Sequence, residues 1–517
     1  MTDVSSEHHS KEIAFNEASA RLEELKKTGK RIVQCHGTFD LIHPGHIVHL
    51  EEAKELGDIL VVTITDETHV NKGPGRPYFN NALRVKSLTS IESVDHVVVV
   101  PFPTAVEAIK CVRPDVYCKG REYADQGNDV TGNIADDVKT VEACGGEIQY
   151  IGSVVFSSTK LLNNHFEPYP ADVKEFCQQV AKETSPDEFK HRIEELAKLK
   201  VLILGDIIFD KYTTIQVQGL SSKNRMLSGR YISEEIQAGG ALAVYRHIAS
   251  FTPHVKLLSL IGNEPWVDRT LRLYLPEKDD LTLHEDMKTI VKQRFIEPTS
   301  DEKELSKLFS VNYIDPDWPD REVGSRLARK IEKVISDFDL VIVMDFGHGV
   351  MLDEAQDVVQ NKAVFLSLNC QTNSNNYGFN IINQRYQRAD SFSLDRTEIS
   401  FASGKKKPNY SESLASLKEE LNARYAWLTL GDQETIGMHD DYAPCYCTPY
   451  EPAVIDTIGA GDAFCALASL SAVAGHSLQL ATFSSQLAGA QAVKIIGNRD
   501  SLSKARFLKA GMTMLSF

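Results

Sequence analysis

The feature that most constrains the fold is an alternation of short apolar runs with segments of helical spacing, which occurs twice along the chain. The runs of the first series cover residues 31–35, 59–65, 96–100, 116–119 and 147–151. Those of the second cover 200–205, 255–261, 340–344, 363–368 and 425–430. This rhythm is typical of βαβ units around a parallel sheet. We therefore predict an α/β protein with two doubly wound parallel-sheet domains.

The two series also predict the domain boundaries. We expect one domain over 1–165 and another over 199–517. The segment between them, 166–198, is charged, helical in spacing and interrupted by three prolines, which favours a helical linker. A length of 517 residues agrees with two to four domains of roughly 150 residues each.

The composition limits which binding partners and which cellular compartment are compatible with the sequence. The net charge of −16 argues against nucleic acid or an anionic membrane as the main partner. The 9 cysteines lack zinc-site spacing, so we expect reduced thiols and no metal site built from protein ligands. The polar start lacks the apolar region of a secretory signal, and no apolar stretch reaches the ~18 residues that span a bilayer. We expect a cytoplasmic protein.

The most informative segment follows the first predicted strand and reads G-T-F-D-L-I-H-P-G-H over residues 37–46. Pro44 favours a helix start, which places His43 and His46 one turn apart at a helix N-terminus. Free N–H groups and the helix dipole favour phosphate there, and two imidazoles can stabilise charge that develops on a transferring phosphoryl group. The alternative is a pair of helix-start histidines without a ligand. The strand that precedes them favours the phosphate site, to which we also assign Gly37, Thr38 and Phe39.

Three further segments fit an anionic ligand in the first domain. Lys72 lies in a glycine-proline loop over 71–77, which could also be a plain surface turn. Arg84 follows on a predicted helix, where a lone arginine is usually solvated. A hydroxyl-rich helix start, which helix capping alone could explain, consists of Ser157, Ser158, Thr159 and Lys160.

The second domain carries its own anion-binding pattern. Gly459, Ala460 and Gly461 leave backbone N–H groups open at a helix start, and Asp462 follows, where it could take a proton from a hydroxyl. The alternative is a glycine-rich turn with a capping aspartate. Four residues nearer the start of this domain complete a candidate sugar site: Asp206, Asp210, Gly239 and Gly240.

The first domain resembles the cytidylyltransferase-like superfamily over residues 11–165. The shared segments are G-T-F-D-L-I-H-P-G-H, K-G-P-G-R-P, R-P-D-V-Y-C-K-G and S-S-T-K, and they are most similar to heptose 1-phosphate nucleotidyltransferase domains of lipopolysaccharide precursor synthesis. The resemblance implies a Rossmann-like fold in which His43 and His46 stabilise the transition state. It also implies that Lys72 and residues 157–160 hold a triphosphate together with Mg²⁺. The nucleotide, ATP or CTP, stays open.

The second domain resembles the ribokinase-like sugar kinases over residues 199–510, most closely at D-T-x-G-A-G-D. The resemblance implies that Asp462 is the catalytic base and that residues 459–461 form the anion hole for ATP. It further implies sugar contacts from Asp206 and Asp210. Three residues are implied on the nucleotide and Mg²⁺ side: Glu398, Thr429 and Gly431.

Several positions depart from the heptose kinases. Ala243 stands where they have Asn, His348 where they have Lys, Asp395 replaces the first residue of N-x-x-E, and residues 369–371 replace D-P-K. These changes fall in sugar-side segments, so they bear on the identity of the sugar. The domain order is also the reverse of that in the best-known bifunctional heptose enzyme.

Together these patterns predict a bifunctional enzyme that makes a nucleotide-activated sugar. The second domain would phosphorylate a sugar or sugar phosphate, with a D-glycero-manno-heptose 7-phosphate as the specific hypothesis. The first would join the sugar 1-phosphate to a nucleotide and release pyrophosphate. Alternatives are a cytidylyltransferase for a polyol phosphate such as glycerol phosphate, and a second domain that only binds ligand or mediates dimerisation. The resemblance also implies a homodimer or higher homo-oligomer.

Overall fold

The computed structural model describes residues 11–123, 133–152, 158–166, 169–221, 226–275, 281–284, 287–298, 305–314, 321–372, 376 and 378–517. The chain divides into two compact units. The first contains Met1–Lys174 together with Ala505–Phe517, and the second contains Glu175–Lys504. The predicted domains, 1–165 and 199–517 with a linker over 166–198, stay a prediction. The units differ from them chiefly because the last residues of the chain belong to the first unit.

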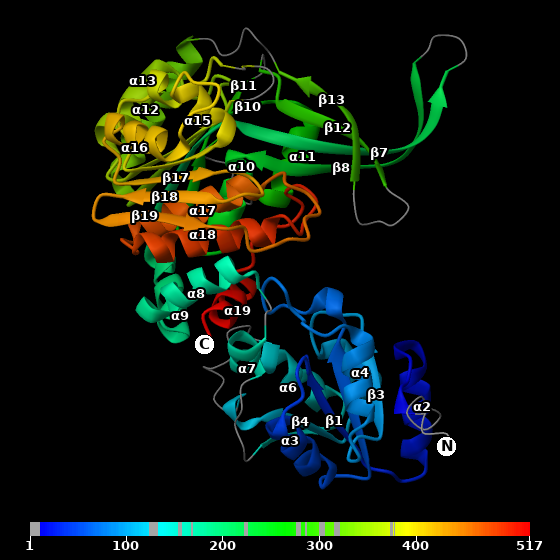
Figure 1. The fold of residues 1–517 in the computed structure, drawn as a ribbon. Helices are drawn as coiled ribbons and strands as arrows, with labels where there is room; N and C mark the ends of the chain where they lie inside the picture. The colour runs from blue at the N-terminus through cyan, green and yellow to red at the C-terminus, as the bar shows by residue number, and fades with distance from the viewer. Residues whose placement is uncertain are drawn as a thin grey trace. The chain divides into compact units, whose positions relative to one another are not determined.

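A five-stranded parallel sheet forms the centre of the first unit (Figure 1). Its strands are β1 (Ile32–Gly37), β2 (Ile59–Thr65), β3 (His96–Val100), β4 (Val116–Gly120) and β5 (Glu147–Ile151). They lie in the order β3-β2-β1-β4-β5, with all neighbours parallel. The order reverses between β1 and β4, and ligands of such sheets bind beyond the carboxyl ends of the strands at this reversal.

Helices cover both faces of this sheet because side chains alternate along each strand. Val33 of β1 packs in one apolar cluster with Leu50, whereas the adjacent Ile32 packs in another with Leu22. The helices of the first unit are α2 (Phe15–Lys27), α3 (Pro44–Lys54), α4 (Asn81–Thr89), α5 (Val106–Val112), α6 (Asn133–Ala143), α7 (Ser158–His165) and, from Ala505 on, α19 (Lys504–Met514). The predicted doubly wound arrangement is therefore confirmed for the first unit.

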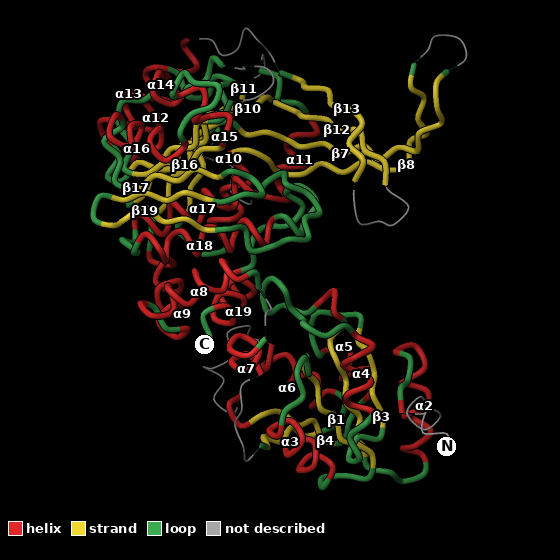
Figure 2. The backbone as a smooth tube through the Cα atoms, viewed as in Figure 1, coloured by secondary structure: helices red, strands yellow, loops and turns green. Residues whose placement is uncertain are grey.

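The second unit contains an eight-stranded sheet in the order β19-β18-β17-β16-β15-β14-β6-β9. Figure 2 shows its strands in yellow, with β16, β17 and β19 labelled. The strands are β6 (Val201–Gly205), β9 (Val255–Leu258), β14 (Leu340–Asp345), β15 (Leu366–Cys370), β16 (Ser391–Asp395), β17 (Tyr425–Thr429), β18 (Thr435–His439) and β19 (Tyr442–Cys447). Neighbours from β9 to β17 are parallel, and β18 and β19 add antiparallel pairs at one edge. The predicted parallel sheet is confirmed with this antiparallel extension.

A second, four-stranded sheet of this unit was not predicted from the sequence. It consists of β7 (Ile207–Leu220), β8 (Leu227–Gly240), β12 (Ile290–Pro298) and β13 (Leu305–Tyr313), in the order β13-β12-β7-β8. The hairpin of β7 and β8 extends well beyond the neighbouring strands (Figure 1). A short parallel pair completes the strands, β10 (Leu260–Gly262) and β11 (Thr282–His284).

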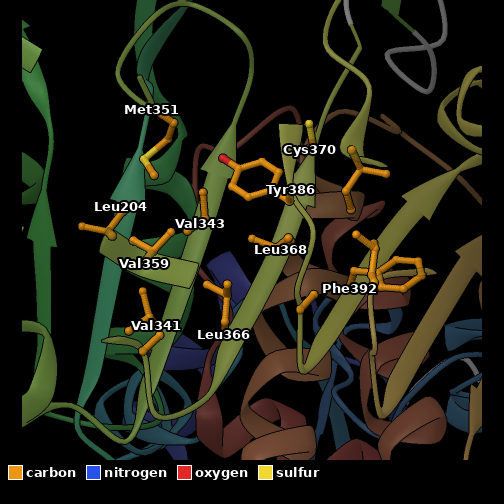
Figure 3. Packing of buried hydrophobic residues seen from close by; sticks show 14 of the residues in the cluster. Leu204, Val341, Val343, Met351, Val359, Leu366, Leu368, Cys370, Tyr386 and Phe392 are labelled. Carbon is orange, nitrogen blue, oxygen red and sulfur yellow. The ribbon is translucent and has the colours of Figure 1, made fainter. Parts of the chain in front are cut away.

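The core of the second unit lies where helices pack on the large sheet. Val341 and Val343 of β14, Leu366 and Leu368 of β15, and Phe392 of β16 belong to one buried cluster (Figure 3). The helices are α8 (Ala171–Glu183), which spans the boundary between the units, α9 (Pro186–Glu195), α10 (Ala241–Ala249), α11 (Pro265–Tyr274), α12 (Arg321–Val334), α13 (Asp353–Lys362), α14 (Ile382–Arg385), α15 (Arg396–Ala402), α16 (Tyr410–Glu420), α17 (Ala460–Val473) and α18 (Leu478–Ala492).

Candidate functional sites

The turn from β1 into α3 brings the two motif histidines of the first unit together. Phe39 in this turn has a φ of 47°, and a β-carbon at Gly37 would lie 3.1 Å from its ring, so the turn has little room for a larger residue. Pro44 is the first residue of α3 and His43 is its N-cap, with Nδ1 accepting the main-chain N–H of His46 at 3.3 Å. The sequence-based placement of both histidines at this helix start is confirmed.

The His43 and His46 rings stack, with their centroids 3.9 Å apart and an interplanar angle of 14°. Burial, followed by the charges of His43 and Lys72, lowers the pKa of His46 to about 3. Burial also lowers the pKa of His43. Both rings are therefore neutral near pH 7, so each can donate one N–H group to an incoming anion while the pair stays free of mutual charge repulsion.

Lys72, which was predicted to bind phosphate, lies close enough to this pair to act on the pKa of both histidines. Burial, then the nearby cation of Lys509, lowers the pKa of Lys72 to about 8, against the opposing effect of Asp40. The described part of the chain gives the Lys72 ammonium no hydrogen-bond or ion-pair partner. A half-buried cation in this situation favours an anionic ligand.

A buried polar network holds the Lys72 loop against the β1–α3 turn. Arg76 Nη1 lies 3.4 Å from Asp40 Oδ2, and Arg76 Nη2 donates to Asn163 Oδ1 at 2.7 Å. The carboxylate of Asp40 also accepts the main-chain N–H groups of Tyr78 and Phe79, each at 2.9 Å. The Asp40 and Arg76 side chains are each only 1% exposed. Removing either partner would therefore leave the charge of the other buried without a counter-ion.

We expect the Asp40→Asn variant to lower the stability of the first unit by about 3–5 kcal/mol, because it leaves the Arg76 charge buried and uncompensated. The loss is measurable by chemical denaturation of the full chain with far-UV circular dichroism. All three tryptophans lie in the second unit, so their fluorescence follows that unit separately.

The matched control is Glu107→Gln, which breaks the exposed ion pair of Glu107 with Lys110 in the same unit. It should change stability by less than about 1 kcal/mol. Equal effects of Asp40→Asn and Glu107→Gln would contradict the assigned role of the buried pair.

Arg84, also predicted as a phosphate ligand, bonds to the protein itself. Its side chain is buried, and Nη1 donates to the carbonyl oxygens of Thr38 at 2.8 Å and Thr65 at 3.0 Å. Nη2 donates to Asn81 Oδ1 at 2.6 Å. These bonds favour a role in holding the β1–α3 turn, and the predicted phosphate contact stays a prediction.

The hydroxyl-rich segment is described only in part. Ser157 and the side chains of Ser158 and Lys160 lie outside the described residues, whereas Thr159 is half-buried in the first turn of α7. Ser158 begins that helix, as the pattern predicted. The triphosphate contacts of this segment stay a prediction.

In the second unit, the glycine turn leads directly into α17. Gly459 is its N-cap with a φ of 84°, and a β-carbon there would lie 2.1 Å from Asn498 Oδ1, so only glycine fits. Ala460 begins the helix, and a β-carbon at Gly461 would meet no atom within 4 Å. The N-terminus of α17 therefore has room beside its backbone for an anion.

Asp462 lies in the first turn of α17 and is 9% exposed. Burial, then the neighbouring carboxylate of Asp210, raises its pKa to about 7, although Lys292 and the side chains of Asn498 and Gln371 act in the opposite direction. A carboxylate with a pKa near 7 is suited to accept a proton from a hydroxyl group.

A second buried aspartate fixes the loop that leads into this helix. Asp456 accepts the main-chain N–H of Ile458 at 3.2 Å and of Gly497 at 3.0 Å. Lys307 of β13 donates to the same carboxylate at 2.8 Å, as does Tyr212 of β7 at 3.4 Å. The four-stranded sheet thus helps to position the turn at 459–461.

Asp210, predicted to bind sugar, lies on β7 and forms an ion pair with Arg294 of β12. Gly239 lies directly beside it, because a β-carbon there would be 2.5 Å from Asp210 Oδ2. Gly240 has a φ of 57° and precedes α10. Since Asp210 also acts on the pKa of Asp462, these predicted residues lie at one site.

Asp206, the other predicted sugar ligand, is fully buried. Its carboxylate accepts main-chain N–H groups of Phe346 at 2.9 Å and of His348 and Val350 at 3.3 Å each. Burial and the Asp345 carboxylate raise its pKa to about 7. This geometry favours a role in anchoring the loop after β14, and the sugar contact stays a prediction.

Lys292 of β12 is a site residue that the sequence analysis missed. Its pKa is lowered by burial, while Asp210, Asp206 and Asp462 act to raise it, so its charge is close enough to interact with all three carboxylates. It also lowers the pKa of His348, the residue that stands where the heptose kinases have lysine. No motif surrounds Lys292, because its position depends on the pairing of β12 with β7.

The predicted nucleotide-side residues follow β16 and β17. Glu398 and Asp395 form a capping box at the start of α15, in which Glu398 Oε2 accepts the main-chain N–H of Asp395 at 2.7 Å. Thr429 ends β17 and donates to Leu394 O at 3.3 Å. Gly431 follows with a φ of 68° and an open side. Because β16 and β17 are parallel neighbours, these residues lie at one edge of the sheet.

Comparison with protein families agrees with this division. Residues 35–162 match the family described as cytidylyltransferase-like, and residues 347–505 match the pfkB family of carbohydrate kinases. The predicted pairing of a domain of a nucleotidyltransferase family with a domain of a carbohydrate-kinase family is therefore confirmed.

Curated relatives match the cytidylyltransferase-like domain. Bifunctional protein HldE of a Nitratiruptor species is 40% identical over 136 residues, which are 26% of this chain and 29% of that protein. Bifunctional protein HldE of Desulfatibacillum aliphaticivorans is 37% identical over 153 residues, 29% of this chain and 30% of that protein. The chain thus spans less than a third of the length of these relatives.

Two solved structures are similar to part of this chain. Arabidopsis thaliana ribokinase complexed with ribose and ATP has a TM-score of 0.46 and 16% identity, covering 62% of this chain and 99% of the ribokinase. Escherichia coli phosphofructokinase-2 in complex with potassium has a TM-score of 0.47 and 14% identity, covering 60% of this chain and 96% of that protein.

Proposed function

We propose that the chain makes a nucleotide-activated sugar, with a nucleotidyltransferase site in the first unit and a sugar kinase site in the second. The observation that carries the proposal is the stacked, neutral pair of His43 and His46 at the start of α3, beside the half-buried cation of Lys72. This arrangement offers imidazole donors, helix N–H groups and a positive charge to one anion. Those are the groups that transfer at an α-phosphate requires.

In the proposed first-unit reaction, an oxygen of the acceptor phosphate attacks the α-phosphorus of a nucleoside triphosphate. The bond from that phosphorus to the bridging oxygen breaks, and pyrophosphate leaves with the electron pair. His43 and His46 donate N–H groups to the oxygens on which charge develops, and Lys72 neutralises part of the triphosphate. Neutral imidazoles suit this role because they need not release a proton at any step.

In the proposed second-unit reaction, Asp462 takes the proton of a sugar hydroxyl as its oxygen attacks the γ-phosphorus of ATP. ADP leaves with the electrons of the broken bond. The N–H groups at the start of α17 hold the transferring phosphoryl group, and Asp456 keeps that turn in place. Lys292 offers a cation beside the reacting groups.

Mg²⁺ belongs to the proposal at both sites. Among the described residues no cluster of three His, Cys, Asp or Glu side chains could hold a metal ion. A single buried carboxylate such as that of Glu398 fits Mg²⁺, which in such sites is bound largely by substrate phosphates and water with one or two carboxylates. When bound, Mg²⁺ would neutralise phosphate charge, and Glu398 is the residue proposed to orient its water in the second unit.

We expect the kcat/KM of the transferase for its nucleoside triphosphate to fall as the pH rises above about 8, because Lys72 then loses its proton. The Lys72→Arg variant keeps its charge and should show no such fall in that range. The measurement is the pH profile of pyrophosphate release under subsaturating nucleotide. The same alkaline fall in both proteins would show that another group titrates.

The substrates are a finer part of the proposal: a D-glycero-manno-heptose 7-phosphate for the kinase and a heptose 1-phosphate as acceptor for the transferase. A separate phosphatase would have to remove the 7-phosphate between the two steps. The test is pyrophosphate release with ATP and with CTP, each against a panel of sugar 1-phosphates and polyol phosphates. Release with ATP and a manno-heptose 1-phosphate would support the heptose assignment. Release only with CTP and glycerol phosphate would favour the polyol alternative.

A cytoplasmic location and assembly into a homodimer or higher homo-oligomer are likewise proposed. The four-stranded sheet of the second unit exposes Tyr231, Ile232, Phe309 and Tyr313, an apolar set that a second copy of the chain would cover. Sedimentation of the purified protein tests this homodimer, and a monomer at micromolar concentration would exclude it. Within the described residues, no helix has both the length and the apolar character needed to cross a bilayer.

A further inference from the structure

The last helix of the chain, α19, lies largely beyond both family matches. The matches end at residues 162 and 505, whereas α19 runs from Lys504 to Met514. Residues 505–517 nevertheless belong to the first unit, although the whole second unit precedes them in the sequence.

The segment packs directly on the loop that carries Lys72. Gly73 has a φ of 93°, and a β-carbon built there would lie 3.4 Å from Cβ and 3.5 Å from Cα of Ala510. The backbone of the loop is therefore in contact with α19 through the residue adjacent to Lys509.

Hydrogen bonds fix the same contact at a second point. Asn163 of α7, which is fully buried, donates from Nδ2 to the carbonyl oxygens of Thr513 and Ser516, each at 2.8 Å. The Oδ1 atom of the same side chain accepts from Arg76, whose other nitrogen reaches Asp40. The C-terminal segment is thus part of the network that holds the turn bearing the histidine pair.

Lys509 of α19 places a positive charge near the Lys72 loop. It lowers the pKa of Lys72, and it acts in the same direction on His36, which lies near the end of β1 just before the motif turn. The ring of His36 is hydrogen-bonded through Nδ1 to the Thr63 hydroxyl at 3.0 Å and through Nε2 to the Thr65 hydroxyl at 3.3 Å. These bonds hold the ring in place near the carboxyl end of β1. The side chain of Lys509 therefore acts on both the carboxyl end of β1 and the Lys72 loop.

Two arginines near the Lys72 loop form hydrogen bonds to groups of the protein. Arg76 bonds to Asp40 and Asn163, and Arg84 bonds to main-chain carbonyl groups. Lys72 and Lys509 are like charges brought together, with Asp40 as the carboxylate that opposes them at Lys72. Cations gathered in this way are stabilised by a bound polyanion.

We propose that Lys509, from the segment that follows the carbohydrate-kinase domain, is a phosphate-binding residue of the nucleotidyltransferase site. The inference rests on the proposed function of the first unit and extends it to a residue outside both family matches. The phosphate is either the triphosphate of the nucleotide or the phosphate of the acceptor.

The test compares full-length variants. Lys509→Met removes the charge and keeps the length of the side chain, and Lys509→Arg restores the charge. Arg506→Ala removes an exposed cation from the same helix and is the matched control. Two measurements are made on each protein: the affinity for inorganic tripolyphosphate by calorimetry, and the KM values for nucleotide and for acceptor in pyrophosphate release.

Lys509→Met should weaken tripolyphosphate binding at one site by about 10- to 100-fold, as expected for loss of a charged hydrogen bond. Lys509→Arg should recover most of this loss, and Arg506→Ala should show none. A higher KM for the nucleotide would assign the contact to the triphosphate, and a higher KM for the acceptor would assign it to the acceptor phosphate. The alkaline limb of the pH profile should also move to higher pH in Lys509→Met, because Lys72 loses a neighbouring cation.

Unchanged tripolyphosphate affinity and unchanged KM values in a folded Lys509→Met protein would overturn the proposal, and would leave the transferase function standing. If instead no acceptor gave pyrophosphate while Lys509→Met still bound tripolyphosphate more weakly, the proposed reaction would fail and the phosphate site would stand.

Discussion

Replacing His43 or His46 with alanine should lower the rate of pyrophosphate release by about 10²- to 10³-fold, the loss expected when one preorganised donor to a developing negative charge is removed. The two rings stack at the N-terminus of α3 with their pKa values lowered, so each is a neutral donor near pH 7. The loss should fall mainly on kcat, because the interaction strengthens as charge develops in the transition state.

Two controls make this result specific. His69→Ala removes an exposed histidine of the same unit and should leave the rate unchanged. Phosphorylation of the sugar by the second unit should also be unchanged in His43→Ala, which shows that the chain is folded. Full transferase activity in both His43→Ala and His46→Ala would remove the basis of the site assignment.

The second large effect is expected for Asp462→Asn, which should lower ATP-dependent phosphorylation of the sugar by about 10²- to 10⁴-fold. The amide is close in shape to the carboxylate but cannot accept the proton of the attacking hydroxyl. The turn at 459–461 keeps its other supports, since Asp456 holds it through Ile458 and Gly497. Transfer of nucleotide to a sugar 1-phosphate supplied directly should not change.

The pH dependence of sugar phosphorylation by the wild-type protein is a second, independent test of the role of Asp462. Because the pKa of Asp462 is raised to about 7, the base is protonated below that pH and ionised above it. The kcat/KM for the sugar should therefore rise with pH through about 7 and then level off. Asp357→Asn, an exposed aspartate of α13, is the matched control and should keep both the rate and the profile. Unchanged ATP turnover in Asp462→Asn with every accepted sugar would instead favour a second domain that only binds its ligand.

The positions of the candidate catalytic residues could be predicted because each motif is contained in a few consecutive residues. His43 and His46 are one helical turn apart after β1, and Asp462 follows its glycine turn directly. Local rules for helix starts and glycine turns therefore suffice to place them. Arg84 and Asp206 show the limit of such rules. Their charge can be read from the sequence, but the main-chain groups to which their side chains form hydrogen bonds cannot.

The missed residues depend on contacts between distant parts of the chain. Lys292 reaches the proposed kinase site through the pairing of β12 with β7, which belong to a sheet that the strand pattern did not predict. Lys509 and Ala510 reach the proposed transferase site from the last helix of the chain, and the bond from Asn163 to Thr513 joins residues 350 positions apart. No spacing rule within a single sequence predicts a contact at that separation.

Label transfer from a nucleoside triphosphate that carries ³²P at the α-phosphorus tests the central claim most directly. The full-length protein would be incubated with this nucleotide, Mg²⁺ and sugar 1-phosphates, and the products separated. The account predicts that the label appears in a nucleotide sugar, in equal amount to released pyrophosphate, and that His43→Ala lowers both about 10²- to 10³-fold. Pyrophosphate release without label in any phosphorylated acceptor, or label transfer that survives the loss of both histidines, would contradict it.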